Sequence, residues 1–403
     1  MNFPPLRPWP RTLRTAVTLI LLAPLPWAEA AEPPQSGPVI EARYRHEGVD
    51  DAAFSRNASA DTVRLRLGYR WVFAPGWQLY ADGEHVQPLF GERYNSTANG
   101  KTDYPVVADP ESDEINQAWI GYSNDAFHAT LGRQLVLLDN QRFFGNSGWR
   151  QNEQTFDALA ASYAFGEARP SVRYTYLDRV LRVFGHRNPN PLQREWSLGG
   201  HLFNVSQALP FGVLSAYAYL VENNDIASQS TRTLGARWSG KHVWGETQFA
   251  WTAEWAEQSE HANNPLSQSA QYRFMEPSVS VGGITLKAGW EVLGGDGHYG
   301  FSTPFATLHA FNGWADRFNA TPVNGLDDRY IGIGGKIGKA VWAASYHDFR
   351  ADHGNQAYGR EFDASIGYPF NKHVSGLLKL ADYRSDGFAS DVRKLWASVE
   401  YRY

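Results

Sequence analysis

The segment Thr62–Trp71, TVRLRLGYRW, alternates between apolar and basic side chains along its whole length. Successive side chains of a β-strand point to opposite faces, so its leucines and aromatic residues face one way and its three arginines face the other. A strand with one apolar and one charged face is typical of a wall that separates lipid from water. The segment therefore predicts a strand of a membrane-spanning β-barrel.

The same alternation recurs throughout the chain, interrupted each time by turn residues such as glycine, asparagine and proline. We expect eighteen strands, at residues 38–48, 62–72, 77–86, 113–123, 126–136, 155–165, 169–180, 195–207, 212–222, 231–239, 243–256, 269–281, 284–293, 327–337, 339–348, 358–368, 373–383 and 394–403. The fold class predicted by this count is all-β, a single transmembrane antiparallel barrel.

The connections between the predicted strands alternate in length. Tight turns are expected at residues 74–76, 124–125, 166–168, 240–242, 282–283 and 338, and longer connections at 87–112, 137–154, 181–194, 257–268 and 294–326. Short periplasmic turns and longer extracellular loops are typical of barrels in the outer membrane of Gram-negative bacteria. An even number of strands places both chain ends on the periplasmic side.

Composition agrees with this fold class. The 403 residues include no cysteine, 15 Trp, 20 Tyr and 22 Phe, which excludes disulfide scaffolds and cysteine-ligated metal sites. A net charge of −5 argues against a nucleic-acid partner. A soluble β-sandwich or propeller is the alternative, but it does not explain aromatic residues near strand ends, where membrane girdles need them. Those residues are Trp71, Trp77, Trp244, Trp255, Trp290, Tyr346, Tyr368, Tyr383 and Tyr403.

The two ends of the chain carry export and assembly signals. Three arginines precede a short apolar run at residues 16–27, and Ala28-Glu29-Ala30 follows. This pattern predicts a cleaved signal peptide at 1–30, a short linker at 31–37 and a barrel at 38–403. The last strand ends on an aromatic residue, which is typical of recognition by the bacterial barrel-assembly machinery. We expect a monomer in contact with outer-membrane lipid and lipopolysaccharide.

The polar faces of the predicted strands should line the lumen. The arginines expected there are Arg43, Arg45, Arg64, Arg66, Arg70, Arg173 and Arg179. Arginines fixed in a narrow aqueous passage attract anions and pair well with carboxylates. The alternative is that they neutralise acids in the wall, as Arg64 or Arg66 could do with Glu84. The sequence leaves both interpretations open.

The connection at 137–154 combines amides, two arginines and three aromatic residues, Phe143, Phe144 and Trp149. A solvated loop has little use for three large aromatic side chains. We therefore expect this connection to fold into the bore and to narrow it, with its arginines facing the solute.

Three motifs in this region are similar to the signature of the alginate-export family of outer-membrane proteins. They are Gly132-Arg-Gln134, the segment 139–146 (DNQRFFGN) and the segment 148–157 (GWRQNEQTFD). The resemblance implies a monomeric eighteen-stranded barrel with an arginine-rich pore that passes an anionic polyuronate. It also implies that Arg133, Arg142 and Arg150 are bore or constriction residues beside Arg64, Arg66 and Arg173.

No motif in the sequence supports catalysis, and we expect no cofactor and no metal centre. Acidic or glycine-rich pieces at 109–114 and 294–297 could take Ca²⁺, but solvated loops are the default interpretation. His298, His309, His347 and His353 lie near one rim without ligand spacing and are interpreted as solvated. The predicted function is a passive channel for anionic or sugar-like solutes, acidic polysaccharides such as alginate included. A plugged structural or adhesin barrel and an outer-membrane enzyme are the alternatives.

Overall fold

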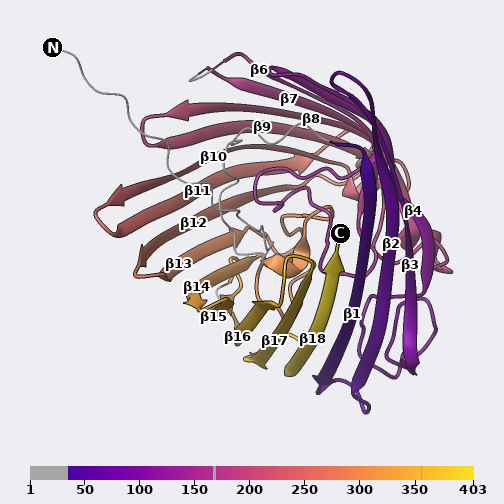
Figure 1. Cartoon of the computed structure of the whole chain (residues 1–403). Helices are drawn as coiled ribbons and strands as arrows, with labels where there is room; N and C mark the ends of the chain where they lie inside the picture. The colour runs from indigo at the N-terminus through magenta and orange to yellow at the C-terminus, as the bar shows by residue number, and fades with distance from the viewer. Residues whose placement is uncertain (1–34, 167–168, 355) are drawn as a thin grey trace.

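The described chain forms a closed β-barrel (Figure 1). The computed structural model describes residues 35–166, 169–354 and 356–403. The predicted signal peptide at 1–30 and residues 31–34 of the predicted linker lie outside this range. Eighteen antiparallel strands make one sheet, and its last strand pairs with its first from Glu41↔Arg402 to Asp51↔Val392. The predicted all-β barrel of eighteen strands is confirmed.

Each of the eighteen predicted segments coincides with a strand. The strands are β1 (Gly37–Asp51), β2 (Ala58–Ala74), β3 (Trp77–Arg93), β4 (Ser112–Ser123), β5 (Phe127–Gln134), β6 (Thr155–Ala164), β7 (Ser171–Leu181), β8 (Glu195–Leu209), β9 (Gly212–Asn223), β10 (Thr231–Trp244), β11 (Thr247–Glu260), β12 (Ser269–Val281), β13 (Ile284–Leu293), β14 (Leu326–Ile337), β15 (Ala340–Arg350), β16 (Ala357–Pro369), β17 (Val374–Ser385) and β18 (Val392–Arg402). Within the described residues, three single-turn helices lie in connections, α1 (Pro191–Arg194), η1 (Ala227–Gln229) and η2 (Leu308–Ala310). Among the described residues, no helix is both long enough and apolar enough to cross a membrane.

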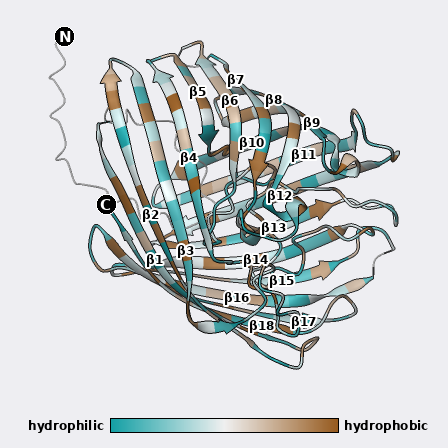
Figure 2. Ribbon diagram, turned by 90° about the vertical axis from the view of Figure 1, so that its right-hand side faces the viewer, coloured by the Kyte–Doolittle hydropathy of each residue, from teal (hydrophilic) through white to brown (hydrophobic). Residues whose placement is uncertain are grey.

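The two faces of the wall follow the alternation of the sequence, which Figure 2 shows as teal and brown alternating along the strands. On β2, Leu65 and Leu67 are 39% and 53% exposed on the outer face, whereas Arg64 and Arg66 are 1% and 5% exposed on the inner face. In lipid every backbone polar group must be paired within the protein, which a closed sheet achieves because it has no free edge. The alternation and the closure together place apolar side chains toward lipid.

Aromatic residues gather at the rim that carries the short turns, here called the turn rim. The rings of Trp71 and Phe73 lie 5.5 Å apart, and those of Trp77 and Tyr122 lie 5.0 Å apart. Rings at this height match an aromatic girdle at a membrane interface. Tyr383 is a correction to the predicted girdle, because it points inward, is fully buried and donates its hydroxyl to the carbonyls of Tyr358 and Phe388.

The turn predicted at 240–242 is also wrong. Gly240 lies inside β10, and the chain reverses at Gly245, which has a φ of +59°. A Cβ on Gly240 would approach a ring carbon of Trp251 to 2.5 Å. This glycine therefore permits close packing across β10 and β11, and sequence periodicity cannot distinguish that use from a turn.

Two long connections enter the barrel from opposite parts of the wall at the other rim, here called the loop rim. The first inner loop, residues 135–154, joins β5 to β6, and the second inner loop, residues 294–325, joins β13 to β14. Their backbones are hydrogen-bonded to each other, from Gly145 N–H to Phe305 C=O at 2.9 Å and from Thr307 N–H to Gln141 C=O at 3.0 Å. The two loops therefore form one body inside the ring of strands.

Candidate functional site

Aromatic side chains of the first inner loop pack inside the barrel, as its composition predicted. Phe143 contacts the ring of Tyr272 edge-on at a centroid distance of 5.4 Å, and Phe144 stacks on Phe305 of the second inner loop at 5.4 Å. Phe143 and Phe144 are 7% and 3% exposed. Burying aromatic side chains removes large apolar surfaces from water and stabilises the inward position of the loop. The prediction that residues 137–154 fold into the bore is confirmed.

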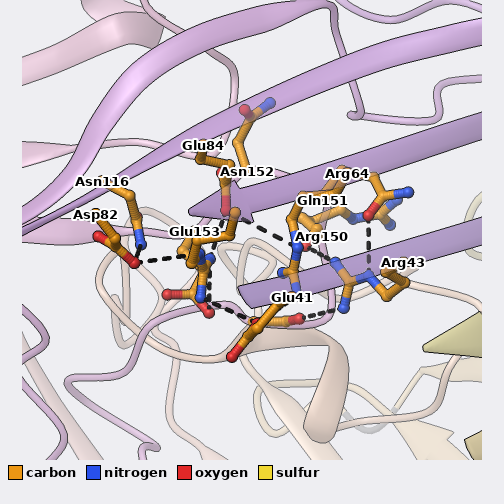
Figure 3. A network of polar contacts seen from close by, with 12 residues as sticks. Glu41, Arg43, Arg64, Asp82, Glu84, Asn116, Arg150, Gln151, Asn152 and Glu153 are labelled. Atoms are coloured by element: carbon orange, nitrogen blue, oxygen red, sulfur yellow. Dashed lines mark hydrogen bonds and ion pairs between the residues drawn. The ribbon is translucent and has the colours of Figure 1, made fainter. Parts of the chain in front are cut away.

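Arg43 of β1 holds the tip of the first inner loop without a carboxylate (Figure 3). Its Nε donates to Gln151 Oε1 at 2.9 Å, its Nη1 donates to the carbonyl of Gly148 at 2.9 Å, and its Nη2 donates to the carbonyl of Arg150. Three donors of one guanidinium are thus used on one short segment. The residue is buried and serves as an anchor for the loop.

Arg64 of β2 lies in a network of carboxylates (Figure 3), and Arg66 of the same strand pairs with acids of that network. Arg64 Nη2 donates to Glu41 at 3.0 Å and to Glu400 at 3.2 Å. Arg66 Nη2 donates to Glu84 of β3 and lies 3.2 Å from Glu153 of the first inner loop. The interpretation in which these arginines neutralise acids of the wall therefore describes their environment, and Glu153 is a loop partner that the sequence did not reveal.

Arg45 completes the same network next to the loop tip. It donates to Asp109, in the connection 94–111 between β3 and β4, and to the carbonyl of Trp149. Asp109 also accepts the backbone N–H of Gln151 at 2.8 Å. The carboxylate considered for a Ca²⁺ loop thus pairs with an arginine, and the described residues contain no group of three or more His, Asp or Glu side chains arranged to hold a metal ion.

The loop carboxylates of this network are held in the ionised form. Burial opposes ionisation of Glu153, but Arg66 and Arg64 lower its pKa below the ordinary value. Burial likewise opposes ionisation of Asp109, whose pKa Arg45 and Arg150 lower. Removing one partner of a buried ion pair leaves an uncompensated charge. The ionised state of Glu153 and of Asp109 therefore depends on the arginines that face them.

Arg142 lies on the opposite side of the first inner loop. Its Nε donates to Glu291 of β13 at 2.7 Å, and its Nη2 donates to Asn312 of the second inner loop at 3.0 Å. Asn312 in turn donates to Glu291 and to Asp328 of β14. Arg142 is 2% exposed, so it connects the two loops to the wall and does not face open solvent.

Arg150 joins the two inner loops through Asp316. Its Nη2 donates to Asp316 at 3.0 Å, and its Nη1 donates to Glu47 at 3.2 Å. Asp316 also accepts a hydrogen bond from Lys394 of β18 at 2.8 Å. Burial opposes ionisation of Asp316, but His309, Lys394 and Arg150 hold its pKa well below the ordinary value.

His309 and His347 are corrections to the sequence interpretation, because both are buried. Lys379 Nζ donates to His309 Nε2 at 2.7 Å, so His309 Nδ1–H donates to Asp316 at 2.7 Å. Burial lowers the pKa of His309 well below its ordinary value. His347 lies on the inner face of β15, 2.9 Å from a carboxylate oxygen of Asp328. A histidine near a rim is interpreted as solvated from the sequence alone, because the sequence does not show which inner loops cover it.

Arg70 and Arg173 lie on the inner face and are not joined to any carboxylate in the described part of the chain. Arg70 lies over the ring of Tyr80 at 5.6 Å, and Arg173 Nη1 donates to the carbonyl of Leu137 at 3.3 Å. Both are partly exposed. They are the predicted lumen arginines whose charge is least compensated by neighbouring acids.

Arg133 and Arg179 are corrections, because the structure places them on the outer face. Arg133 pairs in register with Asp157, two residues along from Leu131 and Leu159, which are 56% and 41% exposed. Arg133 Nε donates to Asp157 at 2.8 Å, and Arg179 Nε lies 3.9 Å from the same carboxylate. A bulge between residues 177 and 179 inverts the alternation of β7. Neither arginine lines the lumen.

A cavity of 390 Å³ lies inside the loop rim, above the joined inner loops. Its wall includes apolar side chains from several connections, together with three cations and two acids. Its polar and aromatic lining includes Trp149, Arg150, His309, Asp316, Arg317 and Lys394. The ring of Trp149 is stacked on that of His309 at a centroid distance of 4.3 Å. This cavity could not be predicted from the sequence, because six separate segments of the chain contribute to it.

No family model and no curated protein sequence matches the chain. Solved structures of outer-membrane channels do match its fold. OpdK of Pseudomonas aeruginosa, solved with vanillate, has a TM-score of 0.71 and 13% identity, over 91% of this chain and 98% of that chain. OccAB4 of Acinetobacter baumannii has a TM-score of 0.70 and 11% identity, over 92% and 99%.

OccK2 (OpdF) of Pseudomonas aeruginosa, solved in complex with glucuronate, has a TM-score of 0.68 and 11% identity, over 91% and 98%. At such low identities these likenesses establish the fold, an eighteen-stranded barrel of the kind found in outer-membrane Occ channels. They agree with the predicted architecture over nearly the whole described chain. Membership of the alginate-export family stays a prediction.

Proposed function

We propose that this barrel is a passive outer-membrane channel for small acidic solutes, with no catalytic step. The loop rim faces the exterior and the turn rim faces the periplasm. The observation that carries the proposal is a closed barrel with an apolar outer face, whose lumen holds cationic groups on both sides of the joined inner loops. Such an arrangement lets water and ions pass a constriction lined by fixed charges.

Arg70 and Arg173 support the preference for anions. They lie on the inner face, they are partly exposed, and in the described residues neither has a carboxylate within ion-pair distance. A guanidinium in a narrow passage replaces part of the hydration of an anion and releases it again when no strong pair forms. On the other side of the constriction, Arg150, Arg317 and Lys394 line the cavity below the loop rim.

The size of the solute follows from the inner loops. Their backbones are hydrogen-bonded across the bore, which divides the interior and favours single small molecules over a long polymer. OpdK and OccK2, of similar fold, have been solved with vanillate and with glucuronate, both small acids. Alginate itself, the finer prediction from the sequence resemblance, would require the two loops to move apart.

The test is a planar-bilayer recording of the refolded mature chain, with the reversal potential measured across a salt gradient. We expect small anion-selective conductances that respond to glucuronate and do not respond to glucose. Block by oligouronates of several residues would support the polymer instead. A silent bilayer, with folding confirmed by a heat-modifiable gel shift, would overturn the channel and favour a plugged structural barrel or an enzyme.

A further inference from the structure

The floor of the cavity below the loop rim contains an internal carboxylate. Asp316 Oδ2 accepts from Arg150 at 3.0 Å and from Lys394 at 2.8 Å, while Oδ1 accepts from His309 at 2.7 Å. All four side chains line the cavity. One carboxylate thus occupies two of the three cations that line the cavity.

We propose that Asp316 is a built-in competitor of the solute: the acidic group of the solute displaces Asp316 from Arg150 and Lys394 and thereby loosens the junction between the two inner loops at this cavity. The inference rests on the proposed channel function and adds a mode of regulation to it. The solute is a small molecule with one carboxylate, because the position that it takes is that of a carboxylate held by one guanidinium and one ammonium.

Because of its position in the chain, the displacement of Asp316 by a solute also changes a contact between the two inner loops. Asp316 belongs to the second inner loop, and Arg150 belongs to the first, so their pair crosses the junction between the loops. Lys394 fixes the same carboxylate to β18. When a solute carboxylate pairs with Arg150 and Lys394, these two charge-assisted contacts of the second loop are lost together.

The other charged groups around the site make Asp316 the exchangeable acid. Glu47 holds the second half of the Arg150 guanidinium from β1 at 3.2 Å, behind the cavity floor. Asp51, the other acid of the cavity wall, pairs with Arg317 at 2.9 Å and accepts from Ser390. Glu47 and Asp51 both belong to the strand wall, whereas Asp316 belongs to a loop. Displacement of Asp316 is therefore the exchange that requires no change in the barrel.

The second inner loop has further contacts that the displacement of Asp316 from its cations does not break. His309 remains hydrogen-bonded to Asp316 within the same loop and stacks on Trp149. Trp314 N–H and Ala315 N–H donate to Asp363 and Glu361 of β16. The two contacts with β16 do not use a cation of the cavity, so they hold the second inner loop at the wall while its junction with Arg150 opens.

The experiment compares the wild-type chain with Asp316→Asn and with a matched control, Asp352→Asn. Asp352 is an aspartate of another connection at the loop rim that pairs with Arg273, so both variants lose one acid from the same rim. Glucuronate is the probe, and glucose is its uncharged counterpart. We measure the frequency of openings to the larger conductance level in single channels, and glucuronate affinity by calorimetry in detergent.

For the wild type and Asp352→Asn, we expect glucuronate to raise the opening frequency and glucose to leave it unchanged. Asp316→Asn should open frequently without glucuronate and should bind it about tenfold more tightly, because no internal carboxylate competes for the cations. Equal affinity and equal opening frequency in Asp316→Asn and Asp352→Asn would overturn the inference. If no variant conducts at all, the proposed channel function itself fails.

Asp316→Glu serves as the second variant if Asp316→Asn does not fold, as judged by its heat-modifiable gel shift. A carboxylate at this position should preserve the low opening frequency and the response to glucuronate. The wild-type response is itself decisive, since an opening frequency that does not change with glucuronate, in a conducting channel, would also overturn the inference.

Discussion

Arginines on the inner face occur in two chemical states that differ in what surrounds the guanidinium. Arg64 and Arg66 are buried among carboxylates of three strands and a loop. Arg70 and Arg173 are partly exposed and have no such partner among the described residues. Coulomb attraction for a passing anion is largely cancelled in the first state and available in the second. The same residue type therefore serves loop attachment in one place and, in the proposed channel, solute attraction in another.

The double variant Arg70→Gln with Arg173→Gln should reduce the preference of the channel for anions. Both substitutions remove a lumen charge that nearby acids do not balance, so the reversal potential across a salt gradient should shift toward that of a non-selective pore. The matched control is Arg133→Gln with Arg179→Gln, which removes the same charge from the outer face. Equal shifts in the two double variants would contradict the assignment of the pathway.

Arg66→Gln should act on stability more than on selectivity. It leaves Glu84 and Glu153 buried without their nearest cation, and breaking a buried ion pair costs about 3–5 kcal/mol. We expect the temperature of the heat-modifiable gel shift to fall clearly. Arg187→Gln, an exposed arginine paired with Glu111 and Asp113, should change it little because surface pairs contribute about 0–1 kcal/mol. An Arg66→Gln variant as stable as the wild type would refute the role of Arg66 in anchoring the loop.

At the scale of elements, two parts of the first inner loop are fixed by contacts of different kinds. Phe143 and Phe144 pack among aromatic side chains of the wall and of the second inner loop. The segment Gly148–Glu153 is instead held by arginines of β1 and β2. Apolar burial stabilises the inward packing, while directional hydrogen bonds fix the position of the tip.

Deleting residues 141–150 should increase single-channel conductance. The deletion removes Phe143, Phe144, Arg142 and the backbone contacts to the second inner loop, and it leaves every strand intact. The barrel should still show its heat-modifiable shift. A folded deletion variant whose conductance equals that of the wild type would mean that this loop does not limit the passage.

For the whole molecule, the strands and the inner loops should respond differently to acid. The pKa values of Glu153, Asp109 and Asp316 are lowered in the folded state because arginines or other cations face them. A lowered pKa contributes stability above the unfolded-state value, about 4 for these carboxyls, and that stability is lost as the pH falls through the folded value. The loops, but not the barrel, should therefore loosen in strong acid.

The corresponding measurement is single-channel conductance from pH 8 down to pH 3. We expect little change over the neutral range and a rise in conductance, with more flickering, below about pH 4. The gel shift at the lowest pH serves as the control for an intact barrel. A transition already complete near pH 6 would point to another titrating group and contradict the role of these carboxylates.

The sequence by itself determined the strands, their number and the two faces of the wall. A period of two and the alternation of turn lengths are local properties, and lipid on one side of a closed sheet makes them decisive. The aromatic composition of residues 137–154 likewise predicted an inward loop. Local patterns were misleading at Gly240 and at Arg179, where a close packing contact and a bulge look identical to a turn and to regular alternation.

The tertiary structure alone decided which charges meet. Arg150 and Asp316 are separated by 166 residues in sequence, and Arg64 and Glu400 by 336. Such pairs form because the sheet closes and because two loops enter the lumen from different strands. The periodicity of the sequence carries no information about either feature. Whether an arginine attracts a solute or anchors a loop is set by the acids around it, because the field at a guanidinium is the sum over neighbours that only the folded chain brings together.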